Sequence, residues 1–139
     1  MKILHKWTVT RIKKAICRFR NFIPEQDLEH IDSLLGKIVY TEDTSKIAEA
    51  GAGILDDGKY CVVFFLRYLW YKPIESLFVT VAHEFAHVFL EHKSKSELPD
   101  EEAEEAVHTQ LKEWGIVEIY YTFYFPSKKN PFLVIDILP

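Results

Sequence analysis

Residues 83–87 read His-Glu-Phe-Ala-His, a spacing of two histidines and a glutamate that can bind and use a metal ion. His83 and His87 are four residues apart, so on a helix both imidazoles project from one face and can share one metal. Glu84 directly follows the first histidine, so its carboxylate can reach a water molecule on that metal without ligating the metal. The pattern predicts a zinc site with His83 and His87 as ligands and Glu84 as general base. The alternative is three ordinary polar residues on a helix surface.

The segment around this motif is predicted to be a helix from about Pro73 to His92. Its apolar residues recur at helical spacing and would form one stripe against a core: Leu77, Phe78, Val81, Phe85, Val88 and Phe89. With about 3.6 residues per turn, the two histidines and the glutamate of the motif fall on the other side of this helix. His92 falls on the apolar side, and we therefore exclude it as a metal ligand.

A catalytic zinc ion usually takes three protein ligands, so the chain should supply one more His, Asp or Glu. A second helix, predicted from Asp100 to about Trp114 and ended by Gly115, begins with a run of acidic residues. The candidates are Asp100, Glu101, Glu102, Glu104 and Glu105. Glu104 flanks the apolar stripe of this helix and lies four residues before His108, so a ligand and a supporting residue could share that face. Alternatively, these carboxylates are solvated and stabilise the helix dipole.

The two segments together resemble zincin metallopeptidases. Residues 81–92, Val-Ala-His-Glu-Phe-Ala-His-Val-Phe-Leu-Glu-His, resemble the active-site helix of that family. Residues 104–108, Glu-Glu-Ala-Val-His, followed by Trp114-Gly115, resemble the gluzincin motif ExxA(D/N). Among zincins, the chain resembles small soluble members such as ImmA/IrrE-type and SprT-like proteins, and the resemblance covers roughly residues 60 to 115. It departs from the gluzincin motif at Val107, where alanine is usual, and at His108, where Asp or Asn is usual.

The resemblance implies a zinc-dependent peptidase that acts on a peptide or protein substrate. His83, His87 and Glu104 would bind one Zn²⁺, with the other acidic residues between 100 and 105 as alternatives for the third ligand. Glu84 would activate the attacking water. The oxyanion needs a further donor, and nothing in the sequence selects among the candidates, which are His108, Tyr120, Tyr121 and Tyr124. For the three tyrosines we favour a packing role.

Zincins also pair an extended substrate with an edge strand that lies above the active-site helix. In this sequence the segment 60–66, Tyr-Cys-Val-Val-Phe-Phe-Leu, is placed to take that role. The alternative is that it is a fully buried central strand.

The chain of 139 residues, 48% of them hydrophobic, suits a single globular domain over residues 1–139. Predicted helices cover residues 10–21, 25–35 (ended by Gly36), 73–92 and 100–114. Predicted strands cover 37–41, a hairpin of 51–55 and 60–66 around Asp57-Gly58, and the segments 118–125 and 132–138. These elements predict an α+β fold. The resemblance implies that it is a compact, minimal zincin-like domain, with a small, mostly antiparallel sheet packed on the helix that carries the HExxH motif of residues 83–87 and on further helices.

The net charge of −4 is unevenly distributed, because the first twenty residues hold seven Lys or Arg and no acid. A basic arm of this kind can bind nucleic acid or an anionic membrane surface. We favour a basic amphipathic helix over residues 1–22 that packs its apolar side on the domain.

No secretory signal, run of about eighteen apolar residues or cysteine-pair motif is present, so a cytoplasmic protein without a membrane span is expected. The alternative function is a non-catalytic zincin-fold module that binds a protein or nucleic-acid partner. The oligomeric state is not indicated.

Overall fold

The computed structural model describes residues 3–45, 48–92, 100–116, 120–123 and 133–136; of residues 100, 120–123 and 133–136 the backbone alone is described. The helices and strands follow one another in this order: α1 (Ile3–Phe22), α2 (Glu25–Leu34), β1 (Leu35–Thr41), β2 (Ala50–Ile54), β3 (Tyr60–Phe65), the 3₁₀ turn η1 (Leu66–Tyr68), α3 (Ile74–Phe89), α4 (Asp100–Glu113), β4 (Tyr120–Phe123) and β5 (Leu133–Asp136). The predicted α+β class is confirmed.

The central sheet has three strands in the order β1-β3-β2 and is mixed. β1 runs parallel to β3, whereas β2 runs antiparallel to it. The predicted hairpin is confirmed: Gly58 has a φ of 84°, a left-handed conformation that favours glycine and lets the chain reverse between β2 and β3. β4 and β5 form a second, two-stranded antiparallel sheet inside the predicted segments 118–125 and 132–138, whose other residues lie outside the described ones.

β3 occupies the centre of the sheet, so the prediction that residues 60–66 form an edge strand is wrong and the alternative of a central strand is confirmed. Its inward residues Val62 and Phe64 are fully buried. A strand that is paired on both sides has no backbone groups left for a substrate. β1 and β2 are the edge strands of this sheet in the described part of the chain.

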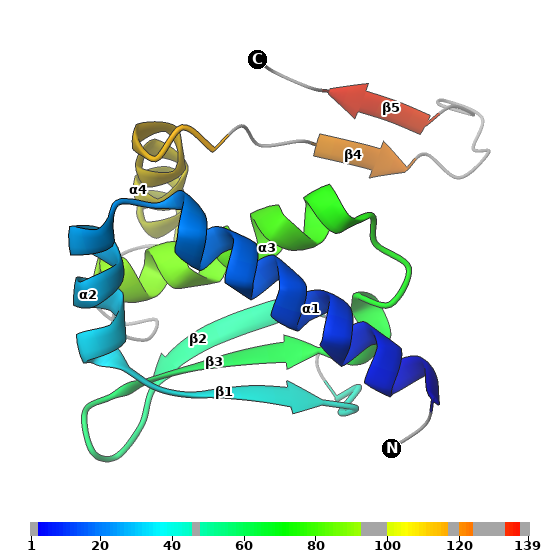
Figure 1. The fold of residues 1–139 in the computed structure, drawn as a ribbon, viewed down its shortest axis with the longest axis horizontal. Helices are drawn as coiled ribbons and strands as arrows, with labels where there is room; N and C mark the ends of the chain where they lie inside the picture. The colour runs from blue at the N-terminus through cyan, green and yellow to red at the C-terminus, as the bar shows by residue number, and fades with distance from the viewer. Residues whose placement is uncertain (1–2, 46–47, 93–99, 117–119, 124–132, 137–139) are drawn as a thin grey trace.

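Helices α1 and α3 cover one face of the sheet and form the other layer of the fold (Figure 1). The apolar side of α1, which includes Ile12, Ile16 and Phe19, is buried against α3. Phe19 sits at the centre of this core, with its ring 5.3 Å from that of Phe85 and 5.5 Å from that of Trp114. The packing favoured from sequence for the N-terminal amphipathic helix is therefore confirmed, as is the apolar stripe predicted for α3.

Gly36 does not end α2 as predicted. The helix ends at Leu34, its C-cap Leu35 is extended, and Gly36 lies inside β1 at a shift in the register with β3. A Cβ at Gly36 would lie 2.8 Å from the Cβ of Lys59, closer than side chains tolerate. The close approach of two chain segments, rather than a helix cap, therefore explains this glycine.

Candidate metal centre

α3 places the HExxH residues on the side that faces α4. His83 and His87 lie one turn apart with their ring centroids separated by 5.0 Å, and both side chains are half-buried. The opposite side of α3 is fixed in the core by Leu77, Val81 and Phe85. Because that stripe sets the rotation of the helix, the two imidazoles have one direction in which to point.

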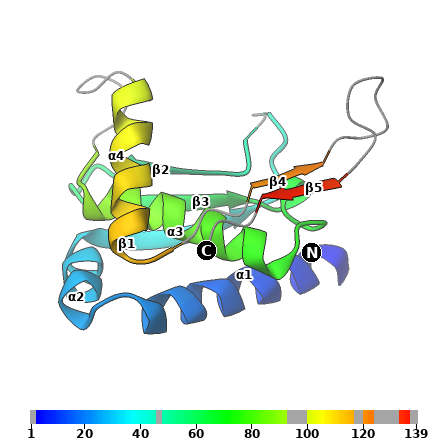
Figure 2. The same ribbon diagram turned by 90° about the horizontal axis from the view of Figure 1, so that it is seen from above.

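α4 brings Glu104 to these imidazoles. Its carboxylate Oε2 lies 3.0 Å from Nε2 of His83, and its Oε1 lies 3.3 Å from Nε2 of His87. α4 is held in place by Leu111, which is fully buried, and by the indole of Trp114, whose Nε1 donates to a carboxylate oxygen of Asp27 in α2 at 2.9 Å. Figure 2 shows α4 crossing the molecule from the side of β2 to the side of α1, past the end of α3.

The three side chains fit a zinc ion. Each offers one ligand atom, and the three atoms lie within 4.8 Å of one another. Tetrahedral zinc, with bonds of about 2.0–2.1 Å, holds its ligand atoms roughly 3.3 Å apart, close to the two contacts above. Two imidazole nitrogens and one carboxylate oxygen are also a donor set of catalytic zinc.

Among the described side chains, His83, His87 and Glu104 are the one group of this kind. Glu101, Glu102 and Glu105 lie outside it, all three on the exposed side of α4. Asp100 begins α4, but its side chain is not described. The structure thus brings together the three residues that the resemblance implies as ligands, and separates three of the four alternative residues from them.

Glu84 is buried, with 8% of its surface exposed. Burial, and to a smaller extent the negative charges of Glu104 and Glu49, raise the pKa of its carboxyl group to about 8. A carboxyl group that is this poorly solvated binds a proton more tightly than an ordinary glutamate does, which suits a group that must take a proton and later release it.

His87 is held in its neutral form. Burial and then the neighbouring His83 lower the pKa of His87 to about 4, although Glu104 acts in the opposite direction. A neutral imidazole keeps the lone pair that a metal requires.

His92 contacts His87 from the far side of its ring, which the sequence did not predict. α3 ends at Phe89 rather than continuing to His92, and Glu91 adopts a left-handed φ of 56° that reverses the chain. As a result Nδ1 of His92 lies 2.8 Å from Nδ1 of His87. The helical projection that placed His92 on the apolar side was wrong, because the helix ends before that residue. His92 nevertheless stays outside the ligand group.

At a zinc site, this contact would give His92 a positioning role. If His87 binds the metal through Nε2, its Nδ1 carries a proton and donates a hydrogen bond to the unprotonated Nδ1 of His92. Burial lowers the pKa of His92, which favours that unprotonated acceptor.

We expect His92→Ala to weaken zinc binding about 10- to 100-fold, because the orientation and basicity of His87 are no longer supported. Competition with a chromogenic zinc chelator measures this. His30→Ala is the matched control, since His30 contacts Glu91 and Phe89 of the same turn but none of the ligands. Equal zinc affinity of the wild-type and His92→Ala proteins would contradict the positioning role.

The other residues predicted at the site are His108 and three tyrosines. The ring centroid of His108 lies 6.2 Å from that of His83, so His108 borders the site. Tyr120 and Tyr121 lie in β4, where the backbone alone is described, and Tyr124 is outside the described residues.

Glu49 also lies near the site, and it was not recognised in the sequence. It pairs with Nζ of Lys72 at 2.5 Å and accepts a hydrogen bond of 3.5 Å from Oγ1 of Thr80, one turn before Glu84. The pairing of β2 with β3, which are separate segments of the chain, brings Glu49 to this position. No pattern in the neighbouring sequence could therefore have predicted it.

The chain has no significant match to a protein-family model, to a curated protein or to a solved structure. The resemblance to zincins therefore depends on the two motifs themselves. The structure adds that the HExxH residues of α3 and Glu104 of α4 converge on one point.

Proposed function

We propose that this protein is a zinc-dependent metallopeptidase that hydrolyses peptide bonds in a peptide or protein substrate. The observation that carries the proposal is the convergence of His83, His87 and Glu104 beside the buried carboxyl group of Glu84. A site that only bound metal for structural reasons would need the ligands but no buried acid next to them.

Each side chain has a role in this proposal. Zinc, when bound by His83, His87 and Glu104, supplies a Lewis acid that lowers the pKa of water toward neutrality and polarises a carbonyl group. Glu84 takes the proton from the water that attacks the scissile carbonyl carbon and delivers it to the nitrogen of the leaving amine. His108, at the border of the site, is the candidate donor to the oxyanion.

The outer edge of β2 is where we expect an extended substrate to bind. Phe65 N donates to Glu49 O, and Leu55 N donates to Lys59 O. Along an antiparallel pair of strands, every second residue hydrogen-bonds to the neighbouring strand. Gly51 and Gly53 therefore also turn their backbone N–H and C=O groups toward β3. Ala50, Ala52 and Ile54 turn theirs to the outer edge, which pairs with no other strand in the described part of the chain. Figure 2 shows this edge on the side where α4 begins.

We expect Ala52→Pro to lower kcat/KM at least about fivefold, mainly through KM. Proline removes an outward N–H and leaves the bonds to β3 intact. The substrate carbonyl oxygen that loses this donor is left unpaired, which costs roughly 1 kcal/mol or more. Steady-state kinetics with an unstructured peptide measures this. Ala52→Ser keeps the N–H and is the control. Unchanged kinetics in a folded Ala52→Pro protein would show that the substrate does not use this edge.

Metal removal tests the proposed function as a whole. Protein purified without added metal should contain about one zinc ion per chain, because a site with three protein ligands binds zinc tightly. A chelator should abolish hydrolysis of a casein or peptide substrate, and added zinc should restore it. Protein that neither contains zinc nor takes it up would rule out the proposal.

A further inference from the structure

Large apolar side chains are exposed together at one end of the molecule, far along α1 from the metal centre. Ile3 is 87% exposed, and Leu4, Trp7, Trp70 and Tyr71 are between 41% and 53% exposed. These five side chains, here called the aromatic end, are five of the seven large hydrophobic residues that the described part of the chain leaves exposed. Scattered exposed hydrophobic residues need no explanation, but a cluster of them indicates an interaction site.

The aromatic end is held together by Arg11. Its Nη1 donates to the carbonyl oxygen of Trp70 at 3.3 Å, and its Nη2 donates to that of Lys72 at 2.6 Å. The same guanidinium lies 4.6 Å from the centre of the Trp7 ring. The rings of Trp70 and Tyr71 then meet edge to face at 5.6 Å. The loop after η1 and the first turns of α1 therefore present one continuous, ordered surface.

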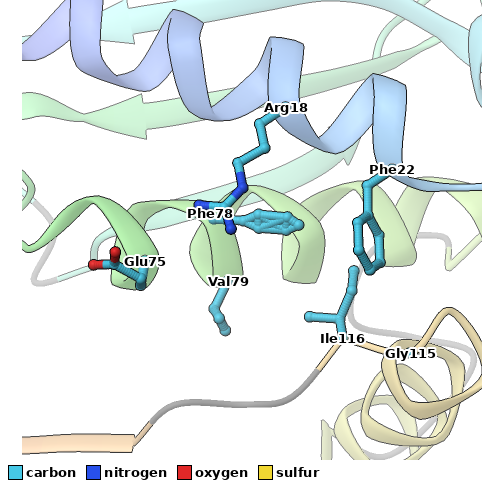
Figure 3. A pocket seen from close by; sticks show the side chains of 7 residues that line it. All are labelled: Arg18, Phe22, Glu75, Phe78, Val79, Gly115 and Ile116. Carbon is cyan, nitrogen blue, oxygen red and sulfur yellow. The ribbon is translucent and has the colours of Figure 1, made fainter.

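Basic side chains continue this surface along α1. Ile3, Trp7, Arg11, Lys14 and Arg18 follow one another at intervals of three or four residues, so they share one side of the helix. Lys14 and Arg18 are exposed, as is Arg67 of η1. Figure 3 shows Arg18 reaching over Phe78, whose ring centre is 4.8 Å from the guanidinium carbon, next to Phe22.

Among the described side chains, few acidic groups lie near this surface. The pocket in Figure 3 includes Glu75, Glu49 is paired with Lys72, and Glu42 is paired with His5. The surface therefore combines exposed aliphatic and aromatic side chains with excess positive charge.

We propose that the aromatic end and the basic side of α1 dock the protein peripherally on an anionic lipid bilayer. Trp and Tyr prefer the boundary between lipid headgroups and acyl chains, Ile3 and Leu4 enter the apolar layer, and Lys14 and Arg18 meet the phosphates. Nucleic acid fits the surface less well, because aliphatic side chains do not stack on bases and Arg11 already directs two of its donors to backbone carbonyls. No helix in the described residues is long and apolar enough to cross a membrane, so the contact proposed is with the bilayer surface.

Flotation with vesicles tests this proposal independently of zinc. We expect the full-length protein to bind vesicles of phosphatidylcholine mixed with phosphatidylglycerol, and to bind pure phosphatidylcholine at least about tenfold more weakly. Binding should also weaken as salt is raised. Trp7 and Trp70 are exposed and Trp114 is buried, so a blue shift of tryptophan emission on binding that disappears in a Trp7→Phe, Trp70→Phe protein would locate the contact.

Two variants separate the apolar and the charged contributions. Ile3→Ser with Leu4→Ser removes exposed side chains only, so it leaves the core intact, and it should reduce vesicle binding about tenfold or more. Lys14→Glu should reduce vesicle binding several-fold. Lys112→Glu, the same change at an exposed position of α4, should not reduce it. Failure to bind anionic vesicles, binding that none of these changes alters, or tighter binding to a single-stranded oligonucleotide than to vesicles would overturn the proposal.

Discussion

Replacement of Glu84 by glutamine should abolish peptide hydrolysis and leave zinc bound. The amide has the shape of the carboxyl group but cannot accept the proton of the attacking water. General acid–base catalysis contributes about 10²- to 10⁴-fold to a rate, so kcat should fall by that factor. Since Glu84 is not one of the ligand group, zinc content should stay at the wild-type level. Initial rates on a fluorogenic peptide, with zinc measured on the same samples, give both quantities.

Glu75→Gln is the matched control, because it makes the same chemical change on the same helix, at the pocket of Figure 3 rather than at the candidate metal centre. It should keep its activity. The Glu84→Gln protein should unfold at the same or a higher temperature than wild type, because it no longer buries an ionisable group. Residual hydrolysis close to the wild-type rate would show that Glu84 is not the base. A protein that binds zinc but never hydrolyses peptides, even before mutation, would favour the alternative of a binding module.

The parts of the site that the sequence predicted are those determined by local periodicity. The stripe of Leu77, Val81 and Phe85 sets which side of α3 is buried, so it also sets where His83 and His87 point. The turn at Gly58 was predictable because a left-handed residue between two strands favours glycine. These features depend on residues a few positions apart.

The features that the sequence did not predict depend on contacts between distant segments or on the exact end of a helix. Gly36 looks like a helix cap, but its real constraint is the approach of Lys59 across the sheet. His92 looks like a core residue on a long helix, until a non-glycine residue, Glu91, takes a left-handed conformation and turns the chain toward His87. The resemblance to zincins assigned β3 the role of an edge strand, and its parallel pairing with β1, which is distant in sequence, makes it central instead. No short window of residues contains both Gly36 and Lys59, or both β1 and β3. His87 and His92 are only five residues apart, but no glycine or proline marks the turn at Glu91.

Replacement of Glu104 by alanine should remove most of the zinc. Two imidazoles alone hold zinc much more weakly than three protein ligands, and loss of a residue that merely supports a ligand already costs about 10- to 100-fold in affinity. We therefore expect the zinc affinity of Glu104→Ala to fall by more than about 100-fold, with hydrolysis lost in parallel at low zinc. Zinc content after dialysis, followed by titration of the zinc-free protein, measures the change.

Glu105→Ala is the control, because Glu105 is the next residue on α4, is exposed, and lies outside the ligand group. A second measurement distinguishes a ligand from a simple ion-pair partner. The side chain of Glu104 is 47% exposed, so its contacts with the two histidines contribute at most about 1 kcal/mol to the stability of zinc-free protein. Zinc-free wild type and Glu104→Ala should therefore unfold at nearly the same temperature, and zinc should raise the unfolding temperature of the wild type far more than that of the variant. Equal stabilisation of both proteins by zinc would remove Glu104 from the site and leave Asp100 as the next residue to test.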